Sequence, residues 1–185
     1  MSQVFIAAAH KSSGKTLVSI GLCAAYRRRG MQVAAFKKGP DDIDPAWLAR
    51  ASGRPCWNLD FFTMGHDEIH SCFEERRQDA DVAVVEGNKG LFDGLDVEGS
   101  DSNAALAVRL GLPVILVIDV TGITRGIAPL LTGYAGFDPD VQIAGVILNR
   151  VAGPRQESKL RAAIERYSDL PVLGTIGRTS GLGIE

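Results

Sequence analysis

The chain has 185 residues, a formal net charge of −2 at pH 7 and a sequence pI near 5.9, and 45% of its residues are hydrophobic. This length suits one well-buried domain and is short for two. The nearly balanced charge excludes the broad basic surface of a protein whose main partner is nucleic acid.

Short runs rich in Val and Ile alternate along the chain with stretches of helix length. The expected strands are residues 4–9, 33–36, 82–85, 114–118, 143–148 and 172–176. The expected helices are residues 15–29, 45–51, 66–77, 102–110, 125–134 and 154–167. Nearly continuous apolar runs are typical of parallel strands that are buried on both faces. The pattern therefore predicts an α/β domain of three layers over residues 1–178, a mainly parallel sheet flanked by helices, with a short tail at residues 179–185.

The first expected strand leads through Ala-His-Lys-Ser-Ser-Gly-Lys-Thr, residues 9–16, into the first helix. In a phosphate loop of this kind backbone N–H groups face a phosphate, Lys15 reaches the β- and γ-phosphates, and the Thr16 hydroxyl is placed to bind Mg²⁺. The context predicts a P-loop NTPase-like fold. Ala9 stands where the motif has its first glycine, and the alternative is an ordinary turn capped by a serine. The predicted nucleotide-binding residues here are Ser12, Ser13, Gly14, Lys15, Thr16 and Leu17, whereas Lys11 either contacts a phosphate or is solvated.

The loop that follows the second strand, residues 37–45, brings two lysines and three aspartates within nine residues. Lysines neutralise the oxygens of a phosphate in transfer, and aspartates bind Mg²⁺ or orient an attacking group. The alternative is a solvated loop in which Asp44 caps the next helix.

Glu86 directly follows the third strand and is predicted as a metal-side ligand opposite Thr16, with Asp93 in the same glycine-rich loop. The alternative is a bare turn. Asp119 either binds a metal or caps a turn, and Asn149 either reads a purine edge or forms a turn. Ligands collect at the carboxyl ends of parallel strands, so all of these clusters are expected at one edge of the sheet.

Three motifs together resemble the synthetase domain of the cobyrinic acid a,c-diamide synthases: the phosphate loop, Phe-Lys-Lys-Gly-Pro-Asp-Asp-Ile-Asp-Pro at residues 36–45, and Val-Glu-Gly-Asn-Lys-Gly-Leu-Phe-Asp-Gly at residues 85–94. Ala-Ser-Gly-Arg-Pro at residues 51–55 adds to the likeness. The resemblance runs to about Arg178 and is nearest to the sirohaem-amidating relatives of sulfur oxidation. The wider superfamily includes dethiobiotin synthetase.

The resemblance implies an ATP- and Mg²⁺-dependent amide ligase whose substrate is a tetrapyrrole of the cobyrinic acid or sirohaem type. An acyl phosphate forms on a peripheral carboxylate, and ammonia then attacks it. A homodimer is also implied. By this analogy Lys15 and Lys37 bind phosphate oxygens, Thr16, Asp41 and Glu86 surround Mg²⁺, Asp44 and Asp93 position the carboxylate or ammonia, and Asn149 contacts adenine.

Full members of that family append a glutamine amidotransferase domain, which we expect to be absent from these residues. Ammonia would then come from solution, a separate subunit or another part of the gene product. The sequence is also compatible with two other functions: a partitioning or switch ATPase, and a dethiobiotin synthetase-like carboxylase. The acidic loop at residues 41–44 argues against a switch, which needs no acceptor site.

Cys23, Cys56 and Cys72 are widely spaced and follow no metal-ligand pattern, so we expect reduced thiols. His66 and His70 lie one helical turn apart without further ligands and are expected at the surface. The chain shows neither a secretory leader nor an apolar run of about 18 residues. These features predict a cytoplasmic protein that does not enter a membrane.

Overall fold

The computed structural model describes residues 2–179. Within them seven strands form one parallel sheet in the order β3-β2-β4-β1-β5-β6-β7. The strands are β1 (Ser2–Ala8), β2 (Val33–Lys38), β3 (Cys56–Leu59), β4 (Val82–Glu86), β5 (Val114–Asp119), β6 (Ile143–Val151) and β7 (Val172–Gly177). The predicted parallel α/β fold is confirmed.

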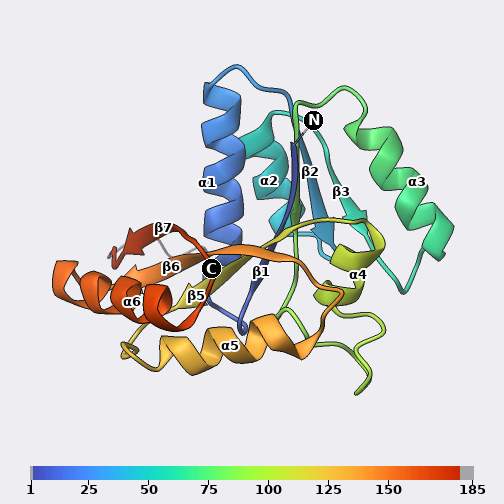
Figure 1. Ribbon diagram of the computed structural model, residues 1–185. Coiled ribbons are helices and arrows are strands. Elements are labelled where there is room, and N and C mark those ends of the chain that lie inside the picture. Colours follow the sequence, from blue (N-terminus) through green and yellow to red (C-terminus); the bar gives the residue numbers. More distant parts are fainter. Residues whose placement is uncertain (1, 180–185) are drawn as a thin grey trace.

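Six helices cover the two faces of the sheet within the described part of the chain (Figure 1). They are α1 (Lys15–Arg28), α2 (Asp44–Ser52), α3 (His66–Arg77), α4 (Asn103–Arg109), α5 (Ile127–Phe137) and α6 (Pro154–Tyr167). Residues of α1 and α2 pack into one hydrophobic cluster, and residues of α3, α4, α5 and α6 pack into the other. The molecule therefore has three layers.

The central strand β1 shows why its sequence is apolar without alternation. Phe5 and Ala7 belong to one cluster, Ile6 and Ala8 belong to the other, and all four are fully buried. Successive side chains of a strand point to opposite faces, so a strand covered on both sides needs apolar residues at every position.

The sequence prediction missed one strand, β3, which has only four residues and pairs with β2 at the edge of the sheet. Its run Cys-Trp-Asn-Leu is short and interrupted by a polar residue, so it lacks the apolar signal of the other strands. Several predicted ends were also too short, most of all for the helix expected to end at residue 134, which continues to Phe137, and the strand expected to end at residue 148, which continues to Val151. Of the expected tail, residues 180–185 lie outside the described residues.

Among residues 2–179 no helix combines the length and the apolar character that a membrane span requires. The side chains of Cys23, Cys56 and Cys72 form no disulfide. His66 and His70 are both exposed.

Candidate active site

The phosphate loop lies between the end of β1 at Ala8 and the start of α1 at Lys15. Gly14 precedes the helix with φ of +96°, and a Cβ atom there would lie 2.2 Å from Nδ2 of Asn149, so only glycine fits. The helix begins without a side-chain cap, and the Oγ of buried Ser13 donates instead to the carbonyl of His10 at 2.7 Å. The alternative of a serine-capped turn is therefore wrong.

Lys37 lies at the centre of a buried polar cluster on the same edge of the sheet. Its Nζ is 2.6 Å from Oδ2 of Asp44, 3.0 Å from Oε1 of Glu86 and 3.1 Å from the carbonyl of Gly87. The sheet itself creates this contact, because Lys37 on β2 is the register partner of Glu86 on β4. Thr16, the second residue of α1, completes the cluster with its Oγ1 2.6 Å from Oε1 of Glu86.

The charges in this cluster are almost completely removed from water, since Lys37 is 2% exposed and Glu86 is 0% exposed. Burial by itself would lower the pKa of Lys37, but the carboxylates of Glu86 and Asp44 outweigh it and raise the pKa. Burial raises the pKa of Glu86, and the charge of Lys37 opposes that rise. The second carboxylate oxygen of Glu86, Oε2, is buried without a hydrogen-bond partner among the described residues. The site thus has acceptor capacity that the protein does not use.

Asp44 and Asp41 make different contacts, since Asp44 reaches Thr16 whereas Asp41 binds the backbone of its own loop. Oδ2 of Asp44 lies 3.3 Å from Oγ1 of Thr16. Asp41 accepts the backbone N–H groups of Ile43 and Asp44 at 3.0 Å each, and its other oxygen lies 3.9 Å from Nζ of Lys37. The alternative that Asp44 caps a helix starting at residue 45 is wrong, because α2 already includes Asp44 and its side chain contacts Lys37 and Thr16 instead. The structure therefore groups Thr16, Glu86 and Asp44, with Asp41 at their edge.

Lys15 reaches from α1 to the loop after β4, where its Nζ donates to the carbonyl of Lys89 at 2.7 Å. It is 8% exposed, and burial together with the charge of Lys37 lowers its pKa. In the same loop Oδ2 of Asp93 accepts the N–H of Gly90 at 2.9 Å. The predicted site residues Lys15, Lys37 and Asp93 therefore lie near one another.

A cavity of about 360 Å³ lies outside the phosphate loop and is lined by Ser12, Gly14, Lys15, Thr16, Leu17, Asn149, Arg150, Ile176, Gly177 and Thr179. All the predicted nucleotide-binding residues line it except Ser13, which is buried in the loop. Nδ2 of Asn149 donates to the carbonyl of Ser13 at 2.8 Å, so this amide nitrogen holds the loop. Asp119 pairs with Arg150 at 2.6 Å and accepts the N–H of Thr121, which confirms its turn interpretation.

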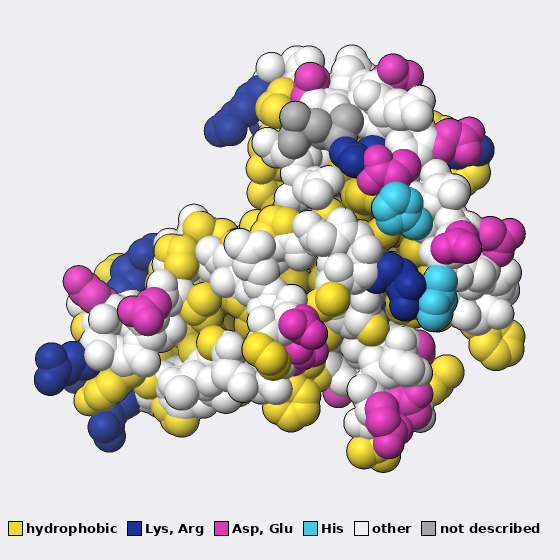
Figure 2. Space-filling model, turned by 45° about the vertical axis from the view of Figure 1, so that its right-hand side comes forward, with side chains coloured by type: hydrophobic (Ala, Val, Ile, Leu, Met, Phe, Trp, Pro, Cys, Tyr) yellow, Lys and Arg dark blue, Asp and Glu magenta, His cyan; other side chains and the backbone are white. Residues whose placement is uncertain are grey.

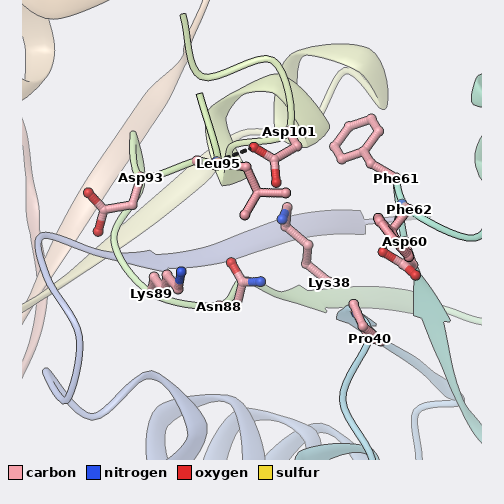
Figure 3. Close-up of a pocket in the computed structure, with 12 residues that line it drawn as sticks. Lys38, Pro40, Asp60, Phe61, Phe62, Asn88, Lys89, Asp93, Leu95 and Asp101 are labelled. Carbon is pink, nitrogen blue, oxygen red and sulfur yellow. Dashed lines mark hydrogen bonds between the residues drawn. The ribbon is translucent and has the colours of Figure 1, made fainter. Parts of the chain in front are cut away.

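A second cavity, of about 310 Å³, lies on the other side of the loop after β4 (Figure 3). It is lined by Lys38, Gly39, Pro40, Asp60, Phe61, Phe62, Asn88, Lys89, Asp93, Gly94, Leu95 and Asp101. The loop between β4 and α4 projects at the bottom of Figure 1. In the view of Figure 2, acidic and hydrophobic side chains lie together at the bottom of the molecule. The contact from Lys15 to the carbonyl of Lys89 joins this cavity to the phosphate site.

Asn103, the first residue of α4, was missed by the sequence analysis. It is fully buried, its Oδ1 accepts the N–H of Asn88 at 3.0 Å, and its Nδ2 donates to the carbonyls of Asn88 and Gly90, the latter at 2.7 Å. One side chain thus fixes the loop that lies between both cavities. Asn58 on the missed strand β3 acts similarly, since its Nδ2 donates to the carbonyl of Asp41 at 2.9 Å.

We expect Asn103→Ala to lower the free energy of unfolding by about 2 kcal/mol, because it leaves buried backbone groups of the loop unpaired. Urea denaturation measures this loss. The control is Ser102→Ala, which removes only the hydrogen bond to the N–H of Ala105 at the start of the same helix. A loss for Asn103→Ala no larger than that of the control would contradict the role of Asn103.

The chain is similar in sequence to a family of nucleotide-binding domains and to longer biosynthetic enzymes. The family model described as CbiA, "CobQ/CobB/MinD/ParA nucleotide binding domain", matches residues 4–184. The cobyrinate a,c-diamide synthase of Magnetococcus marinus is 52% identical over 183 residues, which are 99% of this chain and 39% of the relative. The enzyme of the same name from Syntrophotalea carbinolica is 44% identical over 179 residues, 96% of this chain and 39% of the relative. The chain therefore spans about two fifths of the length of these curated relatives.

Solved structures share the fold at low sequence identity. Chloroplast FtsY from Physcomitrella patens has a TM-score of 0.65 at 17% identity, covering 96% of this chain and 59% of that chain. The hydrogenase maturation factor HypB from Archaeoglobus fulgidus has a TM-score of 0.59 at 14% identity, covering 94% of this chain and 81% of that chain. These likenesses support the P-loop NTPase-like fold and nothing beyond it.

Proposed function

We propose, since this chain belongs to the family of the CobQ/CobB/MinD/ParA nucleotide binding domain, that residues 1–178 are the ATP-dependent synthetase domain of an enzyme that amidates a tetrapyrrole. Two cobyrinate a,c-diamide synthases, at 52% and 44% identity, support the substrate class. The observation that carries the chemistry is the contact of Lys37 with Asp44 and Glu86 beside the phosphate loop.

The reaction requires two transfers. An oxygen of a peripheral carboxylate attacks the γ-phosphorus of ATP while the bond to the ADP oxygen breaks, which gives an acyl phosphate and ADP. Ammonia then attacks the carbonyl carbon, phosphate leaves with that carboxylate oxygen, and the nitrogen loses a proton. Both transfers need alignment and neutralisation of negative charge more than covalent catalysis by the protein.

Each part of the cluster has a role in this scheme. The ammonium groups of Lys15 and Lys37 stabilise the oxygens of the phosphoryl group, because both are held at the same loop edge with most of their hydration removed. Asp93, which lines the second cavity, is placed to orient the acceptor carboxylate or ammonia. We assign Asn149 to the floor of the nucleotide cavity, where it holds the phosphate loop and borders the base.

The donor set fits Mg²⁺. Thr16, Glu86 and Asp44 offer oxygen atoms, which this ion prefers, and the unpaired Oε2 of Glu86 is one of them. Bound there, Mg²⁺ would neutralise charge on the nucleotide phosphates. Among residues 2–179 no three His, Cys, Asp or Glu side chains form a ready metal site, so the proposed ion would also need water or phosphate oxygens as ligands. We therefore assign Asp44 to the metal side, and leave Asp41 the role of shaping the loop.

Ammonia in this proposal comes from a glutamine amidotransferase, carried on another part of the protein or on a separate subunit. The coverage of only 39% of each curated relative is consistent with further domains. The homodimer that the resemblance implies stays a prediction. Sedimentation velocity tests it, because it distinguishes a monomer from a dimer in solution.

The proposal is tested by incubating the protein with Mg-ATP and ammonium chloride, together with either cobyrinic acid or sirohaem. We expect ADP release that requires one of these acceptors, and the mass change that accompanies exchange of a hydroxyl group for an amino group. The acceptor that responds decides between the two tetrapyrrole types. ADP release that requires diaminopelargonic acid and CO₂ would instead indicate the dethiobiotin-type reaction. ATP hydrolysis that needs no acceptor and is stimulated by a protein or a membrane would indicate a switch ATPase.

We expect Asp44→Asn to retain ATP affinity within about threefold but to lose about 100-fold in product formation, because the phosphate loop holds most of the nucleotide whereas Mg²⁺ held beside Asp44 would neutralise charge in the transfer step. Binding of a non-hydrolysable ATP analogue and amide formation are measured separately. Asp42→Asn is the matched control, since Asp42 is an exposed aspartate of the same loop. If Asp44→Asn lost ATP affinity as strongly as product formation, its assigned role would be wrong.

A further inference from the structure

Lys37 and Lys38 are neighbours at the end of β2 but lie in different surroundings. Successive side chains of a strand point to opposite faces. Lys37 therefore faces the phosphate cluster, whereas Lys38 lines the second cavity. Figure 3 shows the ammonium group of Lys38 in the middle of that cavity, directed toward Leu95, with Asn88 and Asp60 to either side.

Lys38 is buried, with 4% of its surface exposed, yet within residues 2–179 its ammonium group has neither an ion pair nor a hydrogen bond. Its one described partner is the ring of Phe61, whose centroid lies 5.8 Å from Nζ. A buried cation without an ion pair or hydrogen bond is costly, because burial removes much of its hydration and no direct polar contact replaces it. Burial accordingly lowers the pKa of Lys38, although the nearby charges of Asp101 and Asp60 oppose the shift.

The carboxylates around the cavity are already engaged with the backbone of their own loops. Asp101 accepts the N–H of Leu95 at 2.7 Å, and Asp60 accepts the N–H of Phe62 at 3.0 Å and the hydroxyl of Thr63 at 2.8 Å. Asp93 accepts the N–H of Gly90. Within residues 2–179, Lys38 is thus a buried charged group of this cavity that no carboxylate contacts directly, although Asp101 and Asp60 act on it from a distance.

The rim of the same cavity is apolar and open to solvent. Phe62 is 84% exposed and Leu95 is 80% exposed, and both line the cavity with Phe61. Exposed apolar side chains around a pocket with a buried polar group are typical of a ligand site. The complementary ligand has an apolar body and an anionic side group.

We propose that Lys38 binds a carboxylate of the acceptor other than the one that is phosphorylated, while Phe61, Phe62 and Leu95 contact the apolar body of the acceptor. This inference rests on the proposed function and specifies its substrate as an apolar molecule with at least two carboxylates. The contact of Lys15 with the carbonyl of Lys89 sets the two cavities side by side, so one acceptor can reach both. Lys38 is in this view a residue that determines affinity and orientation of the acceptor.

The test compares the wild type with Lys38→Met, using the tetrapyrrole that supports ADP release and its derivatives with single carboxylates converted to methyl esters. We expect Lys38→Met to raise the KM for the acceptor at least tenfold, as the loss of a charge-assisted hydrogen bond predicts, with kcat and the KM for ATP within about threefold. Lys38→Arg, which keeps the charge, should recover much of the affinity. Lys159→Met, at an exposed lysine of α6, should change nothing.

The esters separate binding from a merely structural role. One ester should weaken the wild type about tenfold and leave Lys38→Met without a further loss, because the two groups act through the same contact. If Lys38→Met does not fold, reductive methylation of the wild type replaces it: saturating acceptor should protect Lys38 and leave Lys159 reactive. A wild type without acceptor-dependent ADP release would overturn the proposed function. An active wild type whose acceptor KM is unchanged by Lys38→Met, or whose Lys38 is not protected, would overturn this inference alone.

Discussion

Replacing Lys15 by alanine is expected to reduce acceptor-dependent ADP release by about 100- to 1,000-fold, the cost of removing one group that stabilises charge in a transition state. The structure gives the reason: Lys15 is 8% exposed and is held at the phosphate loop by the carbonyl of Lys89, so no other side chain occupies its place. Loss of the side chain also opens the junction between the two cavities. Steady-state ADP release with saturating acceptor measures the effect.

Lys159→Ala is the control for this variant, because it removes an exposed lysine from α6. It should leave turnover unchanged. The free energy of unfolding of Lys15→Ala should be close to that of the wild type, since the exchange removes one cation that burial already disfavours. A Lys15→Ala variant that keeps more than about one tenth of wild-type turnover would show that the phosphate is bound elsewhere.

Lys37→Met is expected to affect both folding and catalysis. Breaking a buried ion pair from one side leaves an uncompensated charge, which costs about 3 kcal/mol of unfolding free energy. Here the side chain removed is 2% exposed and contacts Asp44 at 2.6 Å and Glu86 at 3.0 Å. Urea denaturation measures the stability, and we expect turnover to fall by at least about 100-fold.

The double variant Lys37→Met with Glu86→Gln separates the two effects. It removes the fully buried carboxylate together with its cation, and we expect it to recover at least half of the lost stability, because no buried charge remains at Glu86. Activity should not recover, since both groups are missing from the transfer site. Recovery of turnover with stability would mean that Lys37 is structural only.

The sequence predicts this fold well because its central strands are buried on both faces. The runs in β1, β4, β5 and β6 are nearly unbroken Val, Ile, Leu and Ala, and each is followed by polar groups at one edge. The strand β3 was not predicted, because its four residues include an exposed Trp57 and a polar Asn58 and so lack this apolar pattern. Its existence depends on pairing with β2 and not on its own sequence.

The sequence predicts those site residues that belong to recognisable motifs, but not the contacts between the motifs. The register of β2 and β4, which the sequence does not reveal, brings Lys37 to Glu86, and the hydrogen bonds of Asp41 to its own loop decide that Asp44 is the aspartate nearer Thr16. Asn103 could not be found, because an asparagine at the start of a helix is typical of a cap, and its contacts with residues 88–90 are tertiary. Lys38 likewise became a binding candidate only through its burial without an ion pair or hydrogen bond among the described residues.

The most direct test of carboxylate activation follows an oxygen atom. The acceptor is prepared with a heavy oxygen isotope in its carboxylates and incubated with the protein, Mg-ATP and ammonium chloride, and the released phosphate is examined by mass spectrometry. An acyl phosphate leaves one acceptor oxygen on each phosphate, so we expect labelled phosphate in equal amount to the amide formed. Unlabelled phosphate, formed at the rate of ADP release, would show that water attacks ATP and that no acceptor carboxylate is activated.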